Sequence, residues 1–192
     1  RQRQMCIRDS PKGLKGTVKA VAGAATQSVA DQEEIKKLFP NTYGMPLIKF
    51  ENTDETVDFP AMNVGVILSG GQAPGGHNVI SGIFDGIKKL NKDSKLYGFI
   101  LGPGGLVDHN YMELTADIID EYRNTGGFDI IGSGRTKLEK EEQFEKGLEI
   151  LKELNIKALV IIGGDDSNTN ACVLAEYYAA KNCGVQVLSL IH

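Results

Sequence analysis

Two stretches decide the fold of this chain: VGVILSGGQAPGG at residues 64–76 and LVIIGGDDS at residues 159–167. In each stretch, a β-branched apolar run typical of a buried strand leads directly into glycine-rich backbone, and a helix-compatible segment follows. Backbone N–H groups between a strand and a helix N-terminus can hold a phosphate, because glycine has no Cβ in the way. Two such turns, the second with adjacent carboxylates, predict a site that holds both phosphate and a metal ion.

The main part of the chain alternates between strand-like and helix-like patterns. We expect helices near residues 76–90, 112–122, 138–154 and 168–181, and strands at residues 63–69, 95–101, 128–131, 156–162 and 184–187. Such alternation predicts an α/β fold, a parallel sheet with helices on both faces. Ligands of such sheets bind outside the carboxyl ends of the strands, which is where both glycine-rich turns lie.

The segment before the first of these strands has a different character. Residues 11–62 are punctuated by Gly and Pro and contain one expected helix, over residues 31–39, which Pro40 ends. We interpret residues 11–62 as an N-terminal arm packed on a main domain at residues 63–187.

The two ends of the chain do not look like native protein sequence. Residues 5–10, MCIRDS, and residues 188–192, LSLIH, can be encoded by the two complementary strands of one DNA sequence. That DNA looks like the transposon end used in preparing sequencing libraries. We therefore predict that residues 1–10 and 188–192 are translated adapter and that the chain is an internal fragment; a natural basic N-terminus is the alternative.

Composition narrows the classes of function. The 192 residues are 41% hydrophobic and 24% charged, which suits one globular α/β domain with its own core. The net charge of −4 argues against a general binder of nucleic acids or membrane surfaces, and no apolar run is long enough to span a membrane. The three cysteines lack metal-ligand spacing, which indicates a reducing, cytoplasmic location. Of the three histidines only His77 is near a glycine-rich turn, which argues against a zinc site.

Two elements of the pattern could bind phosphate, and each could instead have only a structural role. Gly70 and Gly71 could bring N–H groups to an anion, or could form a tight turn required only for packing. They are no Walker A loop, because no Lys-Ser or Lys-Thr follows the glycines. Arg135, at the end of another expected strand, could brace phosphate oxygens or be an ordinary surface arginine. We interpret three nearby lysines as the solvated face of a charge-rich helix: Lys137, Lys140 and Lys146.

The carboxylates of the second turn are the more specific signal. Asp165 and Asp166 follow a buried-looking strand, and two adjacent carboxylates repel each other. Mg²⁺ binding would explain why two carboxylates are adjacent there, because Mg²⁺ takes one or two carboxylates plus substrate phosphates and water as ligands. The alternative is a solvated loop whose helix is capped by Ser167 or Asn168.

Together these stretches resemble the phosphofructokinase family, in particular its long diphosphate-dependent members in bacteria and plants. The matching pieces are GVILSGGQAPGGHN at residues 65–78, GSGR at residues 132–135 and IIGGDDS at residues 161–167. ADQEEIKKLFPNTYG at residues 30–44 is similar to the N-terminal arm of that group. The resemblance spans residues 11–187 and implies a truncated, Rossmann-like N-terminal lobe.

The resemblance implies phosphoryl transfer from diphosphate to the 1-hydroxyl of fructose 6-phosphate, with Mg²⁺ held by Asp165. It also implies a parent protein that is a homo-oligomer, a dimer, with no nucleic-acid or membrane partner. The implied diphosphate site has five residues: Gly70, Gly71, Arg135, Gly164 and Ser167.

Asp166 is the residue that the resemblance makes decisive for donor choice. ATP-using relatives have glycine there, so Asp166 would stand where the α-phosphate of ATP lies. Two unit charges about 4 Å apart repel by about 4 kcal/mol at an effective dielectric near 20, which is nearly a thousandfold against ATP. We therefore expect Asp166 to select diphosphate and to support the transition state.

The resemblance also places the catalytic base outside the chain. In this family the base is an aspartate in a Thr-Ile-Asp-Gly-Asp stretch that follows the strand corresponding to residues 184–187, whereas here LSLIH follows. We therefore expect the fragment alone to be inactive. The alternatives are an ATP-dependent phosphofructokinase, a noncatalytic regulatory subunit of the same fold, and, more distantly, a kinase of the NAD kinase type.

Overall fold

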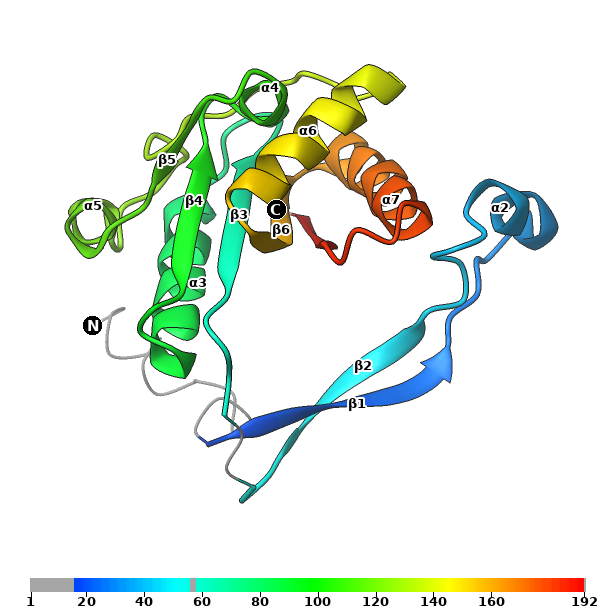
Figure 1. Ribbon diagram of the computed structural model, residues 1–192, viewed down its shortest axis with the longest axis horizontal. Coiled ribbons are helices and arrows are strands. Elements are labelled where there is room, and N and C mark those ends of the chain that lie inside the picture. Colours follow the sequence, from blue (N-terminus) through cyan, green and yellow to red (C-terminus); the bar gives the residue numbers. More distant parts are fainter. Residues whose placement is uncertain (1–15, 56–57, 192) are drawn as a thin grey trace. The chain divides into compact units, whose positions relative to one another are not determined.

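The computed structural model describes residues 16–55 and 58–191, and the chain divides into two units, Arg1–Asp58 and Phe59–His192 (Figure 1). The second unit contains both glycine-rich turns and is built around a sheet. Within the described residues, no helix is both long and apolar enough to cross a bilayer.

The sheet of the second unit has five strands in the order β5–β4–β3–β6–β7. Neighbouring strands among β4, β3, β6 and β7 run parallel, and β5 pairs antiparallel with β4 at one edge. This confirms the expected α/β class, and the antiparallel edge strand departs from a purely parallel sheet. The strands are β3 (Asn63–Leu68), β4 (Lys95–Phe99), β5 (Tyr111–Glu113), β6 (Ile156–Gly163) and β7 (Gln186–Ile191).

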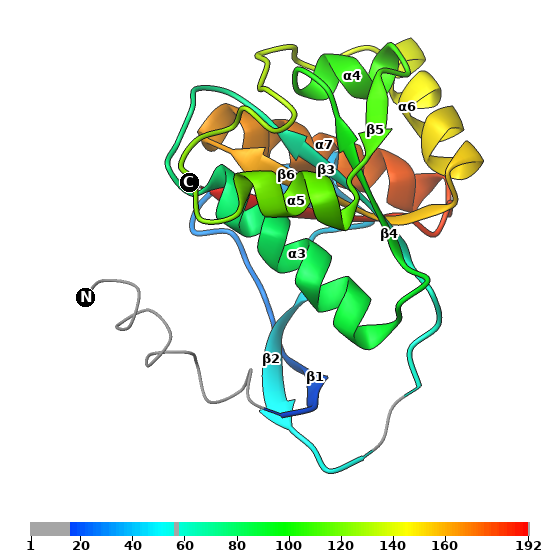
Figure 2. The ribbon, with the colours of Figure 1, turned by 90° about the vertical axis from the view of Figure 1, so that its left-hand side faces the viewer.

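Helices cover both faces of this sheet (Figure 2). One face carries α3 (Gly76–Leu90) and α5 (Ala116–Tyr122). The other face carries α4 (Pro103–Val107), α6 (Glu141–Glu153) and α7 (Asp165–Ala180). Each face has its own buried apolar cluster, as expected for a parallel sheet enclosed by helices.

The pairing of β3 with β6 determines where the two glycine-rich turns lie. Leu68 at the end of β3 is in register with Ile162 near the end of β6, so both turns leave the same edge of the sheet side by side. The chain proceeds from β3 to β4 on one side and later returns to β6 on the other side. Such a switch in strand order opens a crevice at the carboxyl ends of the strands.

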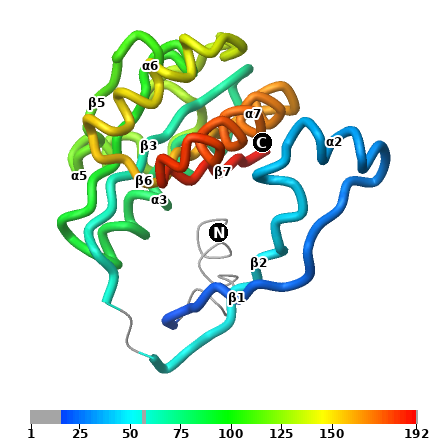
Figure 3. The backbone as a smooth tube through the Cα atoms, turned by 45° about the vertical axis from the view of Figure 1, so that its right-hand side comes forward, coloured from blue at the N-terminus to red at the C-terminus, as the bar shows by residue number. Residues whose placement is uncertain are grey.

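The first unit is a two-stranded antiparallel ribbon with a short helix between its strands (Figure 3). β1 (Val18–Ala25) leads to α2 (Gln32–Leu38), and β2 (Pro46–Asn52) returns beside β1. The helix confirms the expectation at residues 31–39. Neither strand is expected from the sequence; β1 is rich in Ala and Gly, which have low β propensity.

One expected strand of the second unit is wrong. Residues 128–131 form no strand, although Phe128 and Ile131 are buried. Gly127 and Gly132 flank the segment with φ values of 109° and 63°, so the extended backbone is interrupted at both ends. The apolar residues therefore enter the core from a loop instead of a strand.

Other boundaries differ from the expectations in smaller ways. The helix expected at residues 112–122 begins only at Ala116, because the preceding residues form β5. α7 begins at Asp165, three residues earlier than expected, so both carboxylates belong to its first turn.

The end of β7 bears on the adapter hypothesis without testing it. Residues 188–191 are the last four residues of β7, while residues 1–10 and His192 lie outside the described residues. That residues 1–10 and 188–192 are translated adapter therefore stays a prediction.

Candidate functional site

A cavity of about 560 Å³ lies at the carboxyl ends of β3 and β6, a size that suits a small ligand. All seven residues proposed from the sequence line it, together with four others that the sequence reasoning did not select. The lining residues are Ser69, Gly70, Gly71, Arg135, Thr136, Lys137, Gly164, Asp165, Asp166, Ser167 and Asn170.

The first glycine-rich turn is held in place by backbone hydrogen bonds. The Gly70 N–H donates to the Gly134 carbonyl at 2.9 Å, and the Ser69 N–H donates to the Ile162 carbonyl at 2.8 Å. Gly70 has φ 89°, a conformation that strains any residue with a Cβ atom. The turn is therefore fixed between the end of β6 and the loop that carries Arg135.

The second turn packs directly on the first. A Cβ at Gly163 would collide with Ser167 and would lie 2.6 Å from the Ser69 carbonyl oxygen, so only glycine fits there. The Ser167 hydroxyl donates to the Ser69 hydroxyl at 2.8 Å, and both residues are buried. A Cβ at Gly164, in contrast, would meet no atom within 4 Å, which leaves this backbone open to a ligand.

The alternative in which Ser167 or Asn168 caps the helix is wrong. The N-cap of α7 is Gly164, without a side-chain cap hydrogen bond, and Ser167 is bonded to Ser69 instead. The Asn168 side chain donates back to the Gly164 carbonyl at 2.9 Å. Because the first N–H groups of a helix have no intrahelical acceptor, the start of α7 presents donors beside the cavity.

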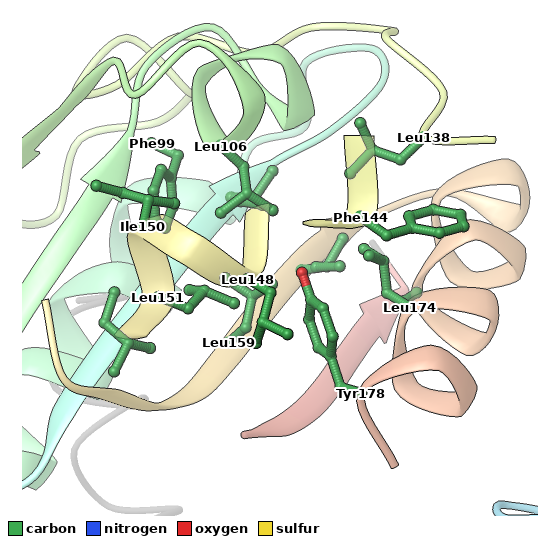
Figure 4. Close-up of a cluster of buried hydrophobic side chains, with 14 of the residues drawn as sticks. Phe99, Leu106, Leu138, Phe144, Leu148, Ile150, Leu151, Leu159, Leu174 and Tyr178 are labelled. Carbon is green, nitrogen blue, oxygen red and sulfur yellow. The ribbon is translucent and has the colours of Figure 1, made fainter. Parts of the chain in front are cut away.

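A large apolar contact fixes α7 on the sheet. Leu174 and Tyr178 of α7 pack with Leu148 of α6 and Leu159 of β6 in one buried cluster (Figure 4). Full burial of one such side chain contributes about 1.5–3 kcal/mol. This packing holds the first turn of α7, and its carboxylates, at a defined place on the sheet edge.

Asp165 and Asp166 lie in that first turn and are both exposed. Negative charge is favourable there, because the N-terminal end of a helix carries a partial positive charge. The Nζ atom of Lys137 lies 3.7 Å from Asp166 Oδ2. Lys137 precedes α6, which begins at Glu141, and lines the cavity, so its assignment to a solvated helix face is wrong.

Arg135 lies on a loop that is anchored at both ends. The Arg135 guanidinium is beside the first turn, since a Cβ at Gly71 would lie 3.8 Å from its Nη2 atom. On the N-terminal side of Arg135, Gly134 forms a β-bridge with Ser69. After it, the Leu138 N–H donates to Asn170 Oδ1 at 3.2 Å, and Asn170 Nδ2 donates to the Leu138 carbonyl at 2.6 Å.

We expect Gly134→Ala to damage this anchoring. The new Cβ would collide with the Leu101 carbonyl oxygen, and overpacking of this kind costs about 1–3 kcal/mol of stability. Urea denaturation should show that loss. Gly82→Ala in α3 is the control: its Cβ meets nothing within 4 Å, and it should stabilise by about 0.5–1 kcal/mol. Equal stability of the two variants would contradict this account of the loop.

His77 supports the segment that leads into the arginine loop. The Ile130 N–H donates to His77 Nε2 at 3.2 Å, so Nδ1 carries the proton and donates to Thr125 Oγ1 at 2.8 Å. The Thr125 hydroxyl in turn donates to the Tyr122 carbonyl at 2.6 Å. Burial lowers the pKa of His77 from its ordinary value of 6.5, and nearby Asp129 opposes that shift in part.

This neutral histidine makes stability sensitive to acid. The unfolded chain binds the His77 proton more tightly than the folded chain, so stability is lost as the pH falls below 6.5. We expect the free energy of unfolding to decrease between pH 7.5 and pH 5.5, and to decrease less in His77→Gln. Denaturation of both proteins at the two pH values measures this; an equal decrease in both would contradict it.

The donor set determines which metal the cavity could hold. Among residues 16–55 and 58–191, no group of three or more His, Cys, Asp or Glu side chains forms a metal site. Two exposed carboxylates beside open backbone do fit Mg²⁺, which keeps several waters and takes its other ligands from substrate phosphates. The arrangement fits a metal ion that enters with a phosphate ligand.

Comparison with known proteins identifies the family of the chain. The family described as Phosphofructokinase matches residues 63–188. The pyrophosphate–fructose 6-phosphate 1-phosphotransferase of Porphyromonas gingivalis is 67% identical over 178 residues, which cover 93% of this chain and 32% of that protein. The protein of the same name from Entamoeba histolytica is 51% identical over 158 residues, 82% of this chain and 29% of that protein.

A solved structure shows the same fold at lower identity. The pyrophosphate-dependent phosphofructokinase of Nitrosospira multiformis superposes with a TM-score of 0.59 at 19% identity, over 68% of this chain and 33% of that one. This chain spans about a third of the length of the curated relatives it matches. The match over residues 63–188 covers most of the sequence, and the chain therefore belongs to the phosphofructokinase family.

Proposed function

We propose that this chain is the donor-binding part of an enzyme that transfers a phosphoryl group from diphosphate to the 1-hydroxyl of fructose 6-phosphate. The products are fructose 1,6-bisphosphate and phosphate. One observation carries the proposal: a single cavity is lined by glycine-rich backbone, a guanidinium and two carboxylates from the two turns. The activity named for relatives at up to 67% identity supports the same substrates.

Each part of the cavity has a role in this proposal. The backbone at Gly70, Gly71 and Gly164, with Ser167, surrounds the donor, and Arg135 braces its phosphate oxygens through paired hydrogen bonds. Asp165 would hold Mg²⁺ together with donor oxygens and water. When bound, Mg²⁺ neutralises charge that develops on the transferred phosphoryl group.

Asp166 selects the donor in this proposal. Its carboxylate lines the cavity from the first turn of α7, where it would repel a third phosphate. Diphosphate has no phosphate to place there. The binding site for the acceptor sugar and the base that takes its proton would come from other parts of the full-length protein, which we take to be about as long as the relatives.

Two finer points belong to the same proposal. We place the protein in the cytoplasm, where the free thiols of Cys172 and Cys183 would stay reduced. We take the full-length protein to be a homo-oligomer, a dimer.

Turnover by the protein expressed from the complete native gene tests the proposal. With Mg²⁺ and fructose 6-phosphate, we expect fructose 1,6-bisphosphate to form from diphosphate and the rate with ATP to be lower by about a hundredfold or more. A higher rate with ATP than with diphosphate would contradict the donor assignment. Absence of turnover with either donor, while diphosphate still binds, would favour the regulatory-subunit alternative.

A further inference from the structure

We propose that Lys137 binds the diphosphate donor directly, as a second cation beside Arg135; this inference rests on the proposed function. Lys137 lines the cavity, and its Nζ atom lies 3.7 Å from Oδ2 of Asp166, which is in the first turn of α7. The ammonium group is therefore already within reach of the carboxylate that would lie beside the donor.

The backbone around Lys137 keeps the ammonium near the cavity. One residue before Arg135 the chain is fixed, because Gly134 bridges to Ser69. One residue after Lys137, Leu138 makes two hydrogen bonds with the Asn170 side chain of α7. Only residues 135–137 lie between these anchors, so the Lys137 backbone cannot move away from the cavity without breaking one of them.

The contact with Asp166 leaves the ammonium free to bind a ligand. Its distance of 3.7 Å is longer than the 2.7–2.9 Å that is typical of a charge-assisted N–H···O hydrogen bond. The side chains are 56% and 86% exposed, and ion pairs this exposed add little to stability. The pair therefore contributes little to the fold, and phosphate oxygens can compete for the three N–H donors of the lysine.

The charges around the cavity favour such a cation. The charged lining residues are Arg135 and Lys137 on one side and Asp165 and Asp166 on the other, so the lining is neutral overall. Without Lys137 the lining side chains alone would carry a net negative charge, which disfavours a polyanionic donor before Mg²⁺ is counted. Lys137 therefore adds a second positive charge beside Arg135, on which diphosphate oxygens can be held.

Calorimetric titration of the full-length protein with Mg²⁺ and diphosphate tests the inference. We expect Lys137→Met to weaken diphosphate binding by about tenfold to a hundredfold, the usual range for a hydrogen bond to a charged group, and Lys137→Arg to restore most of it. Lys146→Met, an exposed lysine of α6 outside the cavity lining, should bind within about twofold of the unchanged protein. All three variants should keep the melting temperature of the parent.

Two results would overturn the inference. The first is equal diphosphate affinity in Lys137→Met and Lys146→Met. The second is a Lys137→Met effect that disappears in an Asp166→Asn background, because Lys137 would then act only by neutralising that carboxylate. If the unchanged protein binds no diphosphate, the proposed function itself fails and the inference fails with it; diphosphate binding by the unchanged protein separates that case from the other two.

Discussion

Asp166→Gly in the full-length protein should turn ATP into a usable donor. At about 4 Å, two unit charges repel by about 4 kcal/mol at an effective dielectric of 20 and by about 1 kcal/mol in bulk water. The Asp166 side chain is 86% exposed, so water screens it until a donor fills the cavity. We therefore expect kcat/KM for ATP to rise by about fivefold at the least and about a thousandfold at the most.

The Asp166→Asn variant distinguishes an electrostatic effect of Asp166 from a steric one. It keeps the size of the side chain and removes its charge, so a gain shared by both variants is electrostatic, and a gain confined to Asp166→Gly is steric. The measurement is kcat/KM for ATP and for diphosphate in all three proteins. If neither variant gains activity with ATP, Asp166 does not select the donor.

Replacement of Arg135 should have the largest effect on the diphosphate reaction. The guanidinium lies beside the first turn and is the group in the cavity that can form two parallel hydrogen bonds with phosphate oxygens. Loss of a donor that stabilises developing charge lowers kcat by about a hundredfold to a thousandfold. We expect Arg135→Met to lower kcat/KM for diphosphate by that factor.

Arg135→Lys is the matched variant, because it retains the charge without the planar pair of donors. It should recover only part of the lost kcat/KM, and the KM for fructose 6-phosphate should change little in either variant. Steady-state kinetics with each substrate varied in turn gives these values. A loss of less than about threefold in Arg135→Met would show that Arg135 is an ordinary surface arginine.

That the candidate residues come together in one cavity was largely predictable, because their signal is local in the sequence. Strand-to-glycine turns fix the course of the backbone over a few residues, and parallel pairing then brings their ends together. Leu68 and Ile162 are in register, which is why Gly70 and Asp165 line one cavity.

Lys137 and Asn170 show what the sequence pattern could not supply. Lys137 stands in a run of charged residues, and its position at the cavity depends on the two hydrogen bonds between Leu138 and Asn170. Those bonds join segments that are 32 residues apart, and no periodicity records them. Ser69 lies within the first glycine-rich stretch, but the sequence alone does not show that it lines the cavity or bonds to Ser167.

The errors in secondary structure have a similar origin. The apolar run at residues 128–131 has the composition of a buried strand, but hydrogen bonds to distant residues decide its path. His77 accepts the Ile130 N–H, and Ile131 accepts from the Leu101 N–H at 2.9 Å. Core burial alone therefore does not distinguish a strand from a buried loop.

The most direct test of the central claim is a crystal structure of the full-length protein with Mg²⁺ and a non-hydrolysable diphosphate analogue. The account predicts phosphate oxygens within hydrogen-bond distance of the Gly70 and Gly71 backbone and of Arg135, with the metal ion on Asp165. An analogue bound outside this cavity, with both aspartates free of metal and ligand, would contradict it.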